Sequence, residues 1–143
     1  MSAATITLQR RVPAAGIPSP ASLRIFAHAA LGRRGGELTL RITDEAESRA
    51  LNHRYRGRDY ATNVLSFPYQ EPGMLGDLVL CAPVVAREAK AQGKPLRAHW
   101  AHLVIHGCLH LLGYDHEQSQ AAEKMEKLEI RILRNLGFAN PYL

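Results

Sequence analysis

The chain has 143 residues, of which 46% are hydrophobic and 22% charged, with a formal net charge of +5. This length suits one domain with its own core, and this composition excludes a disordered chain or a fibrous repeat. The apolar runs are too short for a membrane-spanning helix or a secretory signal, so we expect a cytoplasmic protein without membrane contact. The positive net charge permits a polyanionic partner.

The N-terminal part of the chain predicts a strand, a helix and a second strand. Residues 4–10 and 37–43 alternate apolar and polar side chains, as half-buried strands do. Between them, Ser19 or Ser22 can cap a helix that ends near Leu31.

A second helix is predicted over residues 45–55, where Asp44 can serve as its N-cap. The spacing of its apolar residues predicts which face turns inward. That face consists of Ala46, Ala50 and Leu51.

The C-terminal part predicts a hairpin followed by three helices. Residues 63–69 and 75–81 are rich in β-formers and flank a Pro-Gly turn, so we expect them to pair antiparallel. Glycines mark the ends of the helices that follow. We expect these helices at about 83–93, 96–112 and 119–136.

The element order β-α-β-α-β-β-α-α-α predicts an α+β fold. We expect a small mixed four-stranded sheet packed with about five helices, formed by residues 1–143 as a single domain.

Five of the seven histidines lie between residues 99 and 116, and three of them have metal-ligand spacing. His106 and His110 are four residues apart, so their imidazoles share one face of a helix. Gly113 can turn the chain back and let His116 return as a third ligand. Three histidines with an open fourth position are typical of catalytic zinc, although they also suit nickel, copper or iron. We predict one divalent metal per chain, with Zn²⁺ as first choice.

His102 lies one turn before His106 and is an alternative ligand. However, positions 102, 106 and 110 form a stripe along a helix and do not converge on one point. We therefore expect His102 to support a ligand from outside the metal site, or to pack the helix.

The spacing H-x-x-x-H-x-x-G-x-x-H is also that of the metzincin metalloproteases. Those enzymes carry a glutamate directly after the first histidine as general base. Gly107 stands at that position here and cannot accept a proton. A protease of that design is therefore disfavoured.

Residues 49–58 (RALNHRYRGR) contain four arginines and no acidic residue. In metal-assisted hydrolysis of a phosphodiester, the metal can deliver hydroxide, and an arginine can bind the anionic phosphate. Tyr55 adds a ring that can stack on an unpaired base. The segment is thus a candidate RNA-binding surface, or alternatively a solvated basic helix end. Its candidate substrate-binding residues are Arg49, Arg54, Tyr55, Arg56 and Arg58.

These motifs together resemble the YbeY family, bacterial endoribonucleases of rRNA maturation. The resemblance covers nearly the whole chain, and its HGCLHLLGYDH segment is highly specific. The blocks that carry it are LNHRYRGRDYATNVLSFPY (51–69), LGDLVLCAPVVAREAKAQGK (75–94), HWAHLVIHGCLHLLGYDH (99–116) and the final NPY (140–142).

The resemblance implies that His106, His110 and His116 hold a zinc-type metal, and that Arg56 is the functionally important arginine. It implies cleavage of single-stranded RNA, maturation of the 16S rRNA 3′ end and ribosome quality control. The implied partners are rRNA and the small ribosomal subunit with its assembly factors. Asp115 either orients a ligand histidine or is a turn residue.

The leading hypothesis is therefore a metal-dependent endoribonuclease with Arg56 as its catalytic arginine. One alternative is a zinc hydrolase of another substrate class, such as peptides. A second is a non-catalytic ribosome assembly factor whose metal stabilises the fold.

Overall fold

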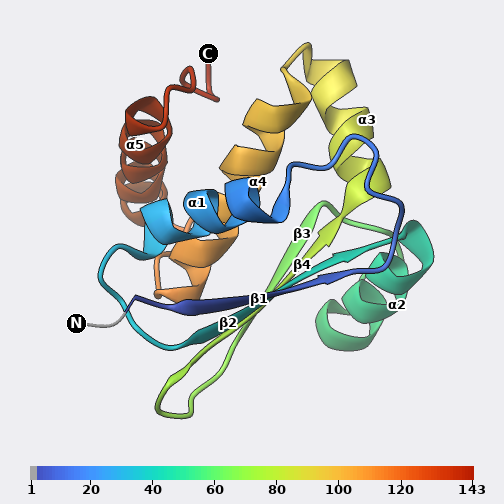
Figure 1. The fold of residues 1–143 in the computed structure, drawn as a ribbon, viewed down its shortest axis with the longest axis horizontal. Helices are drawn as coiled ribbons and strands as arrows, with labels where there is room; N and C mark the ends of the chain where they lie inside the picture. Colours follow the sequence, from blue (N-terminus) through green and yellow to red (C-terminus); the bar gives the residue numbers. More distant parts are fainter. Residues whose placement is uncertain (1–2) are drawn as a thin grey trace.

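The computed structural model describes residues 3–143 (Figure 1), so Met1 and Ser2 of the predicted domain lie outside the described part. Within it the predicted α+β class and element order are confirmed, with boundaries close to those expected. The elements are β1 (Thr5–Arg10), α1 (Pro20–Leu31), β2 (Glu37–Thr43), α2 (Glu45–Arg56), β3 (Val64–Pro68), β4 (Met74–Cys81), α3 (Ala82–Gln92), α4 (Leu96–Leu111) and α5 (Ser119–Asn135).

The four strands form one mixed sheet in the order β1-β2-β4-β3. β1, β2 and β4 run parallel, and β3 pairs antiparallel with β4 at one edge, as the short connection predicts. Along β2, Leu38, Leu40 and Ile42 are buried while the residues between them are more exposed. This alternation means that one face of the sheet is covered, and Figure 1 shows α1, α4 and α5 on that side.

α4 is the central helix, and most of its residues are buried. It packs against α1, α3 and α5 and lies on β3 and β4. Gly107 stands where α4 approaches the sheet: a Cβ at this position would lie 2.8 Å from Cδ2 of Leu78. The position that carries the general base in metzincins therefore faces a packed core in this fold, and a glutamate there has no room. None of the helices in residues 3–143 is long and apolar enough to cross a membrane.

The predicted inner face of α2 is wrong. The buried residues of this helix are Ser48 and Asn52, because α2 packs its polar side chains onto the loop that follows it. Ser48 Oγ donates to Thr62 O and accepts from Thr62 N–H, both at 3.0 Å, and Asn52 Nδ2 donates to Tyr60 O at 2.9 Å. Such hydrogen bonds satisfy buried polar groups, so they take the place of apolar packing. The predicted residues are exposed or half-buried: Ala46, Ala50 and Leu51.

Candidate metal centre

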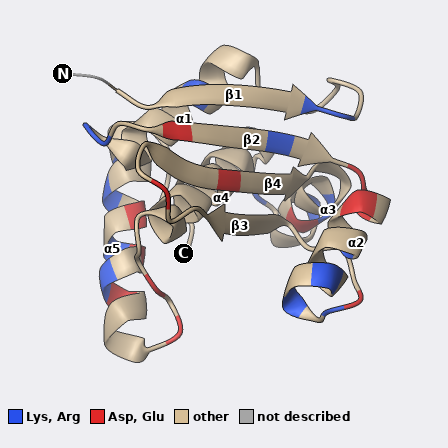
Figure 2. Cartoon of the chain, turned by 90° about the horizontal axis from the view of Figure 1, so that it is seen from below, with Lys and Arg blue, Asp and Glu red and all other residues tan. Residues whose placement is uncertain are grey.

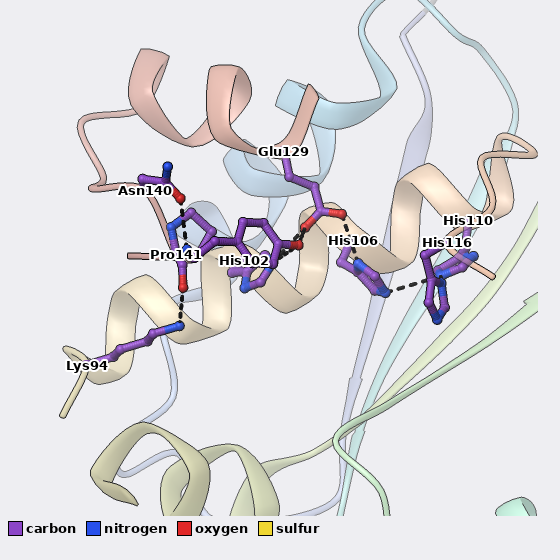
Figure 3. A network of polar contacts seen from close by, with 9 residues as sticks. Lys94, His102, His106, His110, His116, Glu129, Asn140 and Pro141 are labelled. Atoms are coloured by element: carbon purple, nitrogen blue, oxygen red, sulfur yellow. Dashed lines mark hydrogen bonds and ion pairs between the residues drawn. The ribbon is translucent and has the colours of Figure 1, made fainter. Parts of the chain in front are cut away.

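Three histidines converge where α4 ends. His106 Nε2 lies 3.1 Å from His110 Nε2, and His116 Nδ1 lies 2.8 Å from the same His110 nitrogen (Figure 3). Neighbouring ligands of a tetrahedral zinc site stand about 3.3 Å apart, because each Zn–N bond is about 2.0–2.1 Å long. The spacing and chemistry of these nitrogens fit one ion of that size.

Hydrogen bonding among the rings is a poor alternative explanation for their closeness. One imidazole nitrogen carries either a single hydrogen or a single lone pair. His110 Nε2 faces two other ring nitrogens, so it cannot make two well-directed hydrogen bonds. A cation that receives all three lone pairs satisfies the cluster.

The turn after α4 brings His116 to the other two histidines. Gly113 has a φ of +99°, a conformation that side-chain-bearing residues rarely adopt, and its N–H donates to His110 O at 3.0 Å. The chain therefore reverses directly after the helix. His106 and His110 are half-buried on α4, and His116 is exposed on the returning segment.

The metal-free triad is suited to receive a cation. Burial, together with the neighbouring imidazoles of His106 and His116, lowers the pKa of His110 to about 4. The ring is therefore neutral at physiological pH, which is the form of histidine that binds metals.

A carboxylate that the sequence reasoning missed contacts the triad from behind. Glu129 of α5 is fully buried, and Figure 3 shows it reaching from α5 toward His102 and His106. Its Oε2 lies 3.0 Å from His106 Nδ1, and its Oε1 lies 2.6 Å from His102 Nε2 and 2.7 Å from Tyr142 Oη. Burial alone would raise the pKa of Glu129, but these hydrogen bonds lower it to about 2, so the group is ionised. One feature of the sequence could have indicated Glu129. It is a charged residue on the helix face that α5 otherwise buries with Met125, Ile132 and Leu133.

The two residues expected to support the ligands have different surroundings. His102 contacts Glu129 rather than the triad. Asp115 lines the cleft beside the triad, but its Oδ1 accepts from Glu117 N–H at 2.9 Å, which is a turn contact. Glu129, and not Asp115, is the carboxylate with a hydrogen bond to a histidine of the triad.

The triad opens into a cleft of about 590 Å³ that runs between α4, β3 and the end of α2. Arg56, the last residue of α2, lines it, and its Nη2 donates to Ser66 O of β3 at 2.7 Å. The Arg56 guanidinium also lies 5.6 Å from the centre of the Phe67 ring. Arg58 and Tyr60 continue the same wall, with Arg58 Nη1 donating to Tyr60 Oη at 3.4 Å. Arg56 and Arg58 thus face the space in front of the histidines.

The remaining candidates of the 49–58 segment point elsewhere. Arg49 pairs with both carboxylate oxygens of Asp59, at 2.7 and 3.0 Å, and the Arg54 guanidinium lies 5.2 Å from the centre of the Tyr55 ring. None of Arg49, Arg54 and Tyr55 is among the residues that line the cleft. Figure 2 shows the resulting spread of basic residues over α2. The exposed aromatic residue that lines the cleft is Tyr60, which the sequence reasoning did not select.

Comparison with known proteins gives concordant matches. Residues 22–137 match the family model described as Endoribonuclease YbeY. A protein called Endoribonuclease YbeY from Alkalilimnicola ehrlichii is 58% identical over 139 residues, which cover 90% of this chain and 84% of that protein. One of the same name from Pseudomonas putida is 57% identical, covering 96% of this chain and 92% of its own length.

A solved structure shares the fold as well. The solution structure of a Thermotoga maritima protein superposes with a TM-score of 0.60 at 25% identity, covering 93% of this chain and 92% of that one.

Proposed function

The chain belongs to the YbeY family of endoribonucleases, and on this premise we propose that it cleaves single-stranded RNA at one Zn²⁺ ion held by His106, His110 and His116. The observation that carries the proposal is the convergence of three ring nitrogens in a cleft that also contains Arg56 and Arg58. A bound zinc ion supplies a Lewis acid and an acidified water for phosphodiester hydrolysis.

Arg56 is the residue that binds the scissile phosphate. Its hydrogen bond to Ser66 O and its position beside the Phe67 ring hold the guanidinium at the cleft wall. Within residues 3–143 its other N–H groups have no hydrogen-bond partner, so they can form the paired hydrogen bonds with which arginine recognises phosphate oxygens. Arg56 would thereby hold the phosphate in the cleft that the three histidines line and offset the charge that develops on its oxygens.

Arg58 and Tyr60 bind the neighbouring nucleotides. Arg58 adds a second positive charge along the same wall, which suits the next phosphate of an RNA strand. Tyr60 is half-exposed there and offers its ring to an unpaired base. A stacked base must leave a duplex, which gives this site its preference for single strands.

The biological substrate we propose is the 3′ end of 16S rRNA, cleaved during maturation and quality control of the small ribosomal subunit in the cytoplasm. This assignment is supported by the family relationship and by the cleft, whose cationic wall suits a polyanionic strand.

Peptide hydrolysis is disfavoured by two features of the site. Gly107 faces Leu78 in the core, so no general base can stand at the position that metzincins use. The carboxylate that contacts the triad, Glu129, accepts hydrogen bonds on both oxygens and lies on the Nδ1 side of His106, away from the point where the ring nitrogens converge.

The test is metal analysis combined with cleavage of a defined single-stranded RNA. We expect His110→Ala to lose both metal and cleavage, and Arg56→Glu to keep its metal but lose cleavage. Arg49→Glu is the matched control, because Arg49 lies outside the cleft, and it should keep both. Undiminished cleavage by a metal-free protein, or by Arg56→Glu, would overturn the proposal.

The assembly-factor alternative has its own readout in cells. If cleavage is the function, metal-loaded Arg56→Glu cannot support maturation of the small subunit. Normal maturation with this variant would mean that the metal serves the fold alone.

A further inference from the structure

Glu129 is the one acidic residue among the buried side chains of residues 3–143. It lies on the inner face of α5, where its neighbours along the helix are apolar. A buried carboxylate without partners is strongly unfavourable, so its contacts indicate its role.

Both carboxylate oxygens accept hydrogen bonds. Oε2 accepts from His106 Nδ1, and Oε1 accepts from His102 Nε2 and Tyr142 Oη, at distances between 2.6 and 3.0 Å. A histidine that ligates a metal through one ring nitrogen usually donates the N–H of its other ring nitrogen to a carboxylate in this position. Glu129 Oε2 lies 3.0 Å from His106 Nδ1, so this geometry assigns the ring hydrogen of His106 to Nδ1.

This hydrogen determines what the other side of the His106 ring presents. A neutral imidazole has one N–H, so a hydrogen on Nδ1 leaves a lone pair on Nε2. Nε2 is the atom that lies 3.1 Å from His110 Nε2, at the point where the triad converges. In the opposite tautomer, a hydrogen would occupy the position of the metal.

Building on the metal site proposed above, we propose that Glu129 is a positioning residue: it holds His106 as the Nδ1–H tautomer and keeps the Nε2 lone pair directed at the metal. His102 and Tyr142 fix Glu129 in turn by occupying its other oxygen. The C-terminal segment thereby reaches the metal centre through Tyr142, which lies beyond the residues that the family model matches. Lys94 Nζ donates to Pro141 O and anchors that segment near the start of α4.

A second metal ion is the competing explanation, since ligand atoms of His102, His106 and Glu129 also lie within 4.8 Å of one another. An ion there would require His106 to lose both ring hydrogens and bridge two metals. The separations of 2.6 and 3.0 Å from the carboxylate to the two rings are instead those of charge-assisted hydrogen bonds.

The first experiment measures the ring-nitrogen NMR shifts of His106 in the metal-free protein, at a pH where histidine is neutral. We expect a protonated Nδ1 and an unprotonated Nε2 in the wild type, and a mixture of tautomers in Glu129→Gln. Glu123→Gln is the matched control, because Glu123 is an exposed carboxylate on the same helix that pairs with Lys127. It should show the wild-type tautomer.

The second experiment measures zinc affinity by competition with a coloured chelator, beside the unfolding free energy of each metal-free variant. Loss of such an outer contact typically weakens metal binding about 10- to 100-fold, and we expect this range for Glu129→Gln. Tyr142→Phe leaves the His106 contact intact, so it should reduce affinity by less than Glu129→Gln does. Glu123→Gln should match the wild type.

A wild-type His106 protonated on Nε2 would overturn the proposal, as would two zinc ions per chain or unchanged affinity in Glu129→Gln. If Glu129→Gln does not fold, the proposal is still tested by the tautomer of His106 in the wild type and by the zinc affinity of Tyr142→Phe. Neither experiment uses RNA, so a metal site that fails to cleave RNA refutes the proposed function and leaves this inference standing.

Discussion

The two walls of the cleft are built in opposite ways. The α4 wall presents His106 and His110 from a helix buried on most sides, and Glu129 behind His106 is fully buried. The α2 wall presents Arg56 and Arg58 at and beyond the end of a helix whose arginines are exposed. Packing therefore holds the histidines of the triad, whereas a few hydrogen bonds near solvent hold the arginines.

This difference matches the two tasks that we propose for the walls, metal binding and RNA binding. A metal site requires donor atoms placed within a few tenths of an ångström, and only a packed surrounding holds side chains so closely. A flexible RNA strand is better served by cationic side chains that can adjust to it. Substitutions should accordingly damage the fold when they enter the α4 wall and damage only cleavage when they enter the α2 wall.

The largest effect is expected for Gly107→Glu, which restores the metzincin pattern. The new side chain would enter the core against Leu78 and bury an unpaired charge, so we expect destabilisation by more than about 4 kcal/mol. Urea unfolding measures it, with Ala50→Glu on the exposed face of α2 as control. A stable Gly107→Glu protein would show that the α4 wall is looser than described.

The second-largest effect is expected for Arg56→Ala. We expect kcat/KM for a single-stranded RNA to fall about 10²- to 10³-fold, the usual cost of removing one donor to developing charge, with metal content unchanged. Arg56→Lys should recover only part of the loss, because lysine cannot form a paired contact with phosphate. Full recovery by lysine would mean that charge alone matters on this wall.

A smaller effect concerns how α2 is attached to the sheet. The hydrogen-bonded Arg41 guanidinium lowers the pKa of Glu47 from 4.5 to about 2. A lowered pKa stabilises the fold fully above pH 4.5, and this contribution is lost as the pH falls toward 2. The difference in unfolding free energy between wild type and Glu47→Gln should therefore shrink over this interval. A difference independent of pH would show that the ion pair does not anchor α2.

The smallest effect is expected for Arg49→Ala. Its pair with Asp59 is exposed and lies outside the cleft, and exposed pairs contribute little. Cleavage should stay within about threefold of the wild type, in contrast to Arg56→Ala. A loss comparable to that of Arg56→Ala would extend the RNA-binding surface along α2.

Local sequence signals determined the elements and the histidine triad. Strand alternation, serine and aspartate caps and terminal glycines each act within a few residues, so the boundaries were predictable. The same holds for His106, His110 and Gly113, whose spacing is a property of one helix and the turn after it.

The tertiary structure decided which distant residues complete the site. Glu129 meets His106 across 23 positions of the sequence, and Arg56 meets Ser66 across ten. The sequence does not distinguish the four arginines of the 49–58 segment from one another. The packing of α2 on Thr62 and Tyr60 determines that Arg56 and Arg58 face the cleft of the histidines. Spacing along a helix follows from covalent geometry, but the partner of a buried charge is set by how the helices pack, and no local pattern encodes that.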